Sequence, residues 1–144
     1  MSRTELFGQA HVMQRESHTP RPSQKPALRL AALLLGAGTM HFVAPKFFDS
    51  TVPTQLPGDA RTYTYASGVA ELAIGTALAV PRTRRLGGGL AALLFVAVFP
   101  ANVNMAVDWV KSSKTTNVQK AGALLRLPLQ IPLVTESLKA RRRA

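Results

Sequence analysis

The stretch TYTYASGVAELAIGTALAV, residues 62–80, decides the fold because it is long, apolar and interrupted by a single charge. A helix of about 20 residues, rising ~1.5 Å per residue, spans the ~30 Å hydrocarbon core of a bilayer. Glu71 is the one charged residue of this stretch and lies about halfway along it. Gly68 and Gly75 fall on the same helical face as Glu71, and small residues mark the faces where membrane helices approach closely. We therefore expect Glu71 to point toward neighbouring helices and not into lipid.

The apolar residues of the whole chain are pooled in the same way. The 144 residues provide room for one domain, and their 47% hydrophobic content is gathered into four blocks with the charges between them. We expect an all-α fold, a four-transmembrane-helix antiparallel bundle. The expected spans are residues 27–44, 62–80, 86–107 and 121–138, flanked by a disordered polar tail at 1–26 and a basic tail at 139–144.

The charge distribution predicts how the bundle is oriented. The net charge is +11, from 18 basic and 7 acidic residues. A strongly basic chain can indicate nucleic-acid binding, but here the basic residues cluster at the ends of the apolar blocks, which is typical of membrane topology and of contact with anionic headgroups. With four spans, eleven basic residues lie on the side of the termini and five on the other side. The positive-inside rule then predicts both termini in the cytoplasm of a multi-pass protein of the bacterial plasma membrane.

Five polar residues fall at similar depths in the expected spans. They are His41, Glu71, Asn102, Arg126 and Gln130. We expect Glu71 and Arg126 to pair, because neither charge is tolerable alone in hydrocarbon. His41 could exchange protons near neutral pH, and the two amides could orient a carbonyl or hydroxyl group. This functional interpretation predicts a polar site that opens outward and suits a quinone headgroup or another small polar ligand.

A structural interpretation of the same residues stays open. The five residues could do no more than join helices. Such a role would give a modest stabilisation, because interhelical hydrogen bonds in membranes are worth only ~0.6–2 kcal/mol each. The chain contains no cysteine, which excludes disulfides and thiolate ligands, and we expect no metal site.

Several short motifs resemble the DoxX family of small bacterial membrane proteins. The resemblance rests on GTMHFVAPKFF, VPTQLPG, SGVAELAIG, VPRTRRLG, FPANVNMA and RLPLQ, which occur in this order between residues 38 and 130. It implies four membrane helices and an association with quinone-coupled redox enzymes. The chain lacks the cysteine pairs of some redox members, so a dithiol mechanism does not apply to it.

These observations lead to one expected function and two alternatives. We expect a redox-associated accessory subunit, not an enzyme on its own, that binds a quinone-like or small polar ligand and acts with a membrane or peripheral oxidoreductase. The alternatives are a small proton-linked permease that titrates Glu71, and a structural membrane scaffold without a ligand. A nucleic-acid partner is not expected, because four apolar spans would keep the protein out of the soluble fraction.

Overall fold

The computed structural model describes residues 23–144, and every regular element in that part of the chain is a helix. The elements are α2 (Lys25–Val43), α3 (Pro45–Asp49), α4 (Ala60–Ala79), α5 (Arg84–Lys111) and α6 (Asn117–Arg142). The all-α prediction is confirmed for these residues. The disordered tail predicted for residues 1–26 lies almost wholly outside them.

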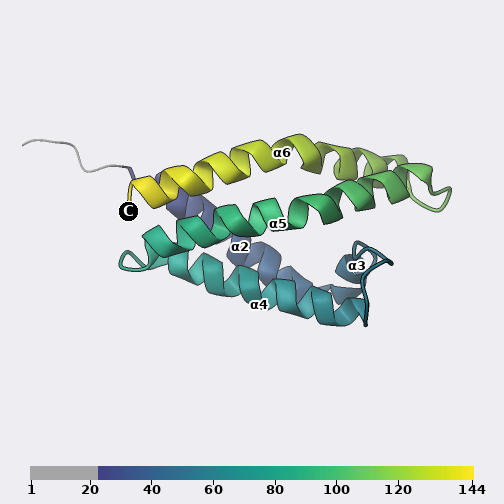
Figure 1. Cartoon of the computed structure of the whole chain (residues 1–144), viewed down its shortest axis with the longest axis horizontal. Coiled ribbons are helices and arrows are strands. Elements are labelled where there is room, and N and C mark those ends of the chain that lie inside the picture. The colour runs from purple at the N-terminus through teal and green to yellow at the C-terminus, as the bar shows by residue number, and fades with distance from the viewer. Residues whose placement is uncertain (1–22) are drawn as a thin grey trace, which may run out of the picture.

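The four long helices run in alternating directions and are arranged as two pairs (Figure 1). α2 packs chiefly on α4, and α5 packs chiefly on α6. The start of α2, the α4–α5 turn and the end of α6 meet at one end of the molecule, which we call the terminal end. Gln24 ties it together, since its side chain donates to the Arg143 carbonyl (2.7 Å) and accepts from Arg84 (2.9 Å). The opposite end carries α3 and the α5–α6 turn.

The helix boundaries differ from the predicted spans at their ends. α2 begins two residues before the predicted block, because Pro26 occupies the first turn, where its missing N–H costs nothing. α6 begins at a capping box in which Thr116 and Gln119 exchange hydrogen bonds, and it extends into the predicted basic tail as far as Arg142. α5 runs through Pro100 without interruption.

One helix was not predicted. The connection between the first two predicted spans begins with the short helix α3. Pro45 starts α3 directly after α2 ends, with φ already suited to a first helical turn. Residues 23–144 thus form five helices instead of the four predicted.

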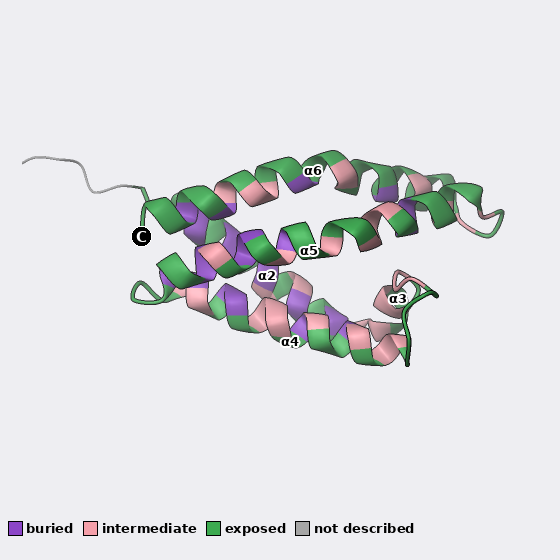
Figure 2. Ribbon diagram, in the orientation of Figure 1, coloured by how far each residue is buried: buried purple, intermediate pink, exposed green. Residues whose placement is uncertain are grey.

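The buried residues gather toward the terminal end (Figure 2). The main hydrophobic cluster joins all four long helices there, and a smaller one lies between α5 and α6 near the opposite end. The outward faces remain apolar, with Leu86, Leu93 and Ile131 each more than 60% exposed. Among the helices of residues 23–144, two, α2 and α5, are long and apolar enough to cross a membrane.

Candidate functional site

A cavity of about 180 Å³ lies where the four long helices meet. Its walls are mostly leucine, valine and phenylalanine side chains, and polar side chains enter from three helices. These polar residues are Glu71 from α4, Asn102 from α5, and Arg126 and Gln130 from α6. Four of the five predicted site residues therefore line one cavity, although they are far apart in the sequence.

Glycines bring α2 and α4 close together beside this cavity. A Cβ atom on Gly68 would lie 2.8 Å from the Cβ of His41, and one on Gly75 would lie 2.9 Å from Leu35. Gly38 faces Gly68 from α2 in the same way, with the Gly68 carbonyl oxygen 3.0 Å from its added Cβ. The predicted small-residue face of α4 is thus the face that packs on a neighbouring helix, and Glu71 lies on it.

Glu71 has an incompletely satisfied carboxylate. Its Oε2 atom is buried and accepts no hydrogen bond, whereas buried polar atoms in folded proteins nearly always have a partner. The charge of Arg126 acts on Glu71, but no ion pair joins the two, and Arg126 is exposed at the rim of the cavity. The predicted Glu71–Arg126 pair is thus replaced by an open arrangement in which both groups face the same cavity.

His41 is the predicted residue that does not line the cavity. Its Nδ1 lies 3.4 Å from Glu71 Oε2 and 2.8 Å from the carbonyl oxygen of Ala37. A carbonyl oxygen only accepts, so Nδ1 carries a proton directed at Ala37. Glu71 is therefore within ion-pair distance of the imidazole without receiving its hydrogen bond. The ring also stacks on Phe48 of α3, with centroids 3.7 Å apart.

Gln130 has a structural contact within the site. Its side-chain amide is buried and donates to the Phe95 carbonyl of α5. This hydrogen bond fastens α6 to α5 at the depth of the cavity. One of the two predicted amides is thus already engaged between helices, whereas Asn102 forms no hydrogen bond through its side chain among the described residues.

A protein-family model matches most of the chain. The model is described as "Domain of unknown function (DUF8561)", and it matches residues 30–141. The chain belongs to the DUF8561 family. No curated protein and no solved structure matches the chain.

The resemblance to DoxX is therefore wrong. All the motifs on which it rested lie inside the segment that the DUF8561 model matches. Glycine, proline and aromatic residues are common in and around membrane helices of many kinds, so short motifs built from them carry little information about family. The expected link to quinone-coupled redox enzymes depended on the resemblance and loses its basis with it.

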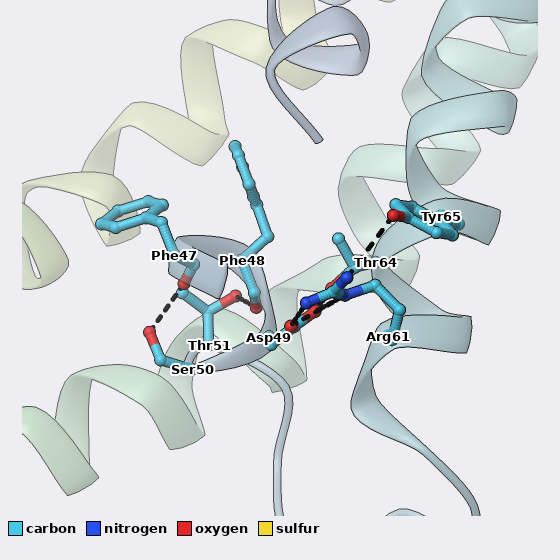
Figure 3. A network of polar contacts seen from close by, with 8 residues as sticks. All are labelled: Phe47, Phe48, Asp49, Ser50, Thr51, Arg61, Thr64 and Tyr65. Carbon is cyan, nitrogen blue, oxygen red and sulfur yellow. Dashed lines mark hydrogen bonds and ion pairs between the residues drawn. The ribbon is translucent and has the colours of Figure 1, made fainter. Parts of the chain in front are cut away.

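In this DUF8561 protein, a network of polar contacts around Asp49 holds α3 in place (Figure 3). The sequence did not predict this network. Asp49 accepts hydrogen bonds from Arg61 Nε (2.9 Å) and from the Thr64 hydroxyl (2.7 Å), and Arg61 Nη2 lies 2.8 Å from the carboxylate. The guanidinium of Arg61 holds the pKa of Asp49 below its usual range. Phe47 lies edge-on to Trp109 of α5, with centroids 6.2 Å apart. α3 thus links α4 to α5 beside the cavity.

Replacing Asp49 with asparagine is expected to release α3. Trp109 is the only tryptophan of the chain and contacts Phe47, so its fluorescence emission should shift when α3 moves. Asp59→Asn is the matched control, because Asp59 forms no side-chain hydrogen bond at the start of α4. An equal shift in both variants would contradict the role assigned to Asp49.

The pH dependence of the same signal has a defined sign. Because the pKa of Asp49 is lowered in the folded protein, its contribution to stability is complete above the unfolded value of ~3.9. That contribution is lost as the pH falls through the lower, folded pKa. The Trp109 emission should stay constant from about pH 8 to pH 5 and change only below about pH 4.

Proposed function

We propose that all four long helices cross the bilayer and that the protein is a multi-pass protein of the bacterial plasma membrane. α2 and α5 meet the requirements of length and hydropathy. α4 and α6 are more polar overall, but their outward residues are apolar, as shown by Val69 (59% exposed), Leu125 (61%) and Ile131 (69%). An apolar surface on every long helix would be a liability in water and is expected in lipid.

The charges support a cytoplasmic position for the terminal end. Among the described residues that end carries nine basic side chains and one carboxylate, Glu136. The opposite end carries five basic side chains and three carboxylates. Basic residues are enriched on the cytoplasmic side of membrane proteins, so both termini are placed there in the proposal.

Within this membrane domain we propose a binding site for a small polar solute. The observation that carries it is the buried Glu71 Oε2 atom, which lacks a hydrogen bond beside a cavity that Arg126 also lines. A solute with a donor for Glu71 and an acceptor for Arg126 would satisfy both groups away from bulk water. The 180 Å³ volume equals that of about six water molecules, which favours a compact solute over one with a long tail.

Native mass spectrometry of the protein, released from its own membranes in mild detergent, tests this proposal. We expect the wild type to retain a small compound, and Glu71→Gln and Arg126→Gln to lose it, because each removes one of its two charged contacts. Glu136→Gln and Arg142→Gln are matched controls near the cytoplasmic end and should retain the compound. A wild type that carries only structural lipid, or an adduct that survives both cavity substitutions, would favour a scaffold without a ligand.

A proton-linked permease is the second candidate. It is favoured by the closeness of two side chains of titratable type, since His41 Nδ1 and Glu71 Oε2 lie 3.4 Å apart beside the cavity. Proton flux into liposomes should then fall at least tenfold in Glu71→Gln. If Glu71→Gln leaves the proton flux unchanged, the permease proposal is contradicted and the solute-binding proposal remains.

A further inference from the structure

A lateral groove of about 390 Å³ separates α2 from α6 near the terminal end. Leu30 and Leu33 of α2 form one wall, and Leu129 and Leu133 of α6 form the other. With Pro26 on α2 and Glu136 on α6, which also line the groove, each wall extends over about two turns, or ~10 Å along the helix axis. These dimensions suit part of an acyl chain that lies parallel to the helices.

The cytoplasmic end of this groove is basic. Arg29 and Glu136 line it, and the charges of Lys139, Arg143 and Arg29 all act on Glu136. Lys139 Nζ lies 2.7 Å from Glu136 Oε1 and neutralises that carboxylate. Within the described part of the chain, the guanidinium groups of Arg29 and Arg143 have no hydrogen-bonded or ion-paired partner.

Two other grooves among residues 23–144 lack this combination. One groove between α5 and α6, of about 400 Å³, is lined by Val96, Phe99 and Ile131 among others and by no charged residue. Another, near the opposite end, has Lys111 as its one charged residue. The α2–α6 groove therefore differs from these two: Arg29 lines its basic end, and the charge of Arg143 acts on Glu136 at the same end.

We propose that the α2–α6 groove binds one anionic phospholipid of the cytoplasmic leaflet. The acyl chain lies between the leucines, and the phosphate is held between Arg29 and Arg143, since guanidinium groups bind phosphate oxygens through two parallel hydrogen bonds. A headgroup without a cation is favoured, because choline would bring a third positive charge to the two arginines. The inference rests on the proposed membrane location but is independent of the solute in the central cavity.

The full-length protein in mild detergent provides the test. We expect dioleoyl phosphatidylglycerol to raise the unfolding temperature and to be retained at one molecule per chain in native mass spectra. Dioleoyl phosphatidylcholine, with the same acyl chains, should do neither, and glycerol phosphate without acyl chains should have no effect. Equal effects of the two lipids, or an effect of glycerol phosphate equal to that of the lipid, would overturn the proposal.

Two substitutions at the terminal end separate the groove from general basic charge. Arg29→Gln should weaken retention of phosphatidylglycerol at least fivefold, whereas Arg85→Gln, an exposed arginine outside the groove, should leave retention unchanged. Arg29→Lys keeps the positive charge but loses the planar guanidinium that donates two parallel hydrogen bonds. Its retention of phosphatidylglycerol should therefore lie between those of the wild type and Arg29→Gln. Equal losses in Arg29→Gln and Arg85→Gln would overturn the inference. Circular dichroism without added lipid shows whether each variant is folded.

Failure of the lipid inference can be told from failure of the membrane proposal. Recovery of the protein in the soluble fraction of lysed cells would contradict the membrane location and, with it, the lipid site. Recovery in membranes without a preference for phosphatidylglycerol would overturn the lipid site alone.

Discussion

Arg84→Ala is expected to lower the free energy of unfolding by about 2–4 kcal/mol. Arg84 is 7% exposed, and its guanidinium donates to the carbonyls of Leu78 (2.8 Å) and Ala79 (2.7 Å) at the end of α4. It also donates to the Gln24 side chain before α2 (2.9 Å). Alanine would leave the carbonyls of buried Leu78 and part-buried Ala79 without this donor, and an unsatisfied buried acceptor costs about 1–3 kcal/mol.

Chemical unfolding in detergent, followed by circular dichroism, measures this loss. Arg85→Ala is the matched control, because the side chain of this neighbouring arginine is exposed and forms no hydrogen bond with another described residue, and it should change stability by less than about 0.5 kcal/mol. Arg84→Lys should fall between the two, because one ammonium cannot reproduce the planar fork. Equal stabilities of Arg84→Ala and Arg85→Ala would show that the helix end does not depend on this side chain.

Gly88→Ala is expected to separate α5 from the end of α6. An added Cβ would lie 2.7 Å from the backbone nitrogen of Arg141 and 2.9 Å from the Ser137 carbonyl oxygen. Both atoms belong to the α6 backbone, so a change of rotamer cannot make room and the helix itself must move. Overpacking of this kind costs about 1–3 kcal/mol, which exceeds the gain of up to ~1 kcal/mol from the better helix propensity of alanine.

Gly122→Ala is the matched control for Gly88→Ala, and it is not expected to lower stability. Gly122 of α6 has open space where a Cβ would be added, so Gly122→Ala should leave the unfolding temperature unchanged or raise it. The two variants have the same chemical change in a helix and differ in what surrounds it. If both raise the unfolding temperature, the close approach of α5 and α6 at Gly88 does not limit stability.

Local pattern was enough to predict the helices. Long apolar blocks separated by charges and prolines indicated four long helices, and both ends of each helix lie within four residues of the predicted ends. Pro26 and the Thr116–Gln119 capping box explain the differences at two of these ends. The glycine face of residues 68–75 also followed from helical periodicity alone, because positions three and four apart share a face.

The candidate site could be predicted only in part from local sequence patterns. Depth counted along each helix was enough to bring Glu71, Asn102, Arg126 and Gln130 to one level, and the structure places all four around one cavity. Counting residues does not give rotation about the helix axis or the reach of a side chain. The contact of His41 with Glu71, and the use of Gln130 to hold the Phe95 carbonyl, therefore appeared only in three dimensions.

The sequence by itself determined the helical class, the grouping of charge at the helix ends and the small-residue face that carries Glu71. These are periodic or compositional properties, and neighbours along the chain establish them. The tertiary structure decided what surrounds the charges: Arg84 contacts the end of α4, Asp49 pairs with Arg61, and Arg29 lines the same α2–α6 groove as Glu136. The last of these brings together residues about a hundred positions apart, and such a placement depends on how the helices pack, which no local pattern records.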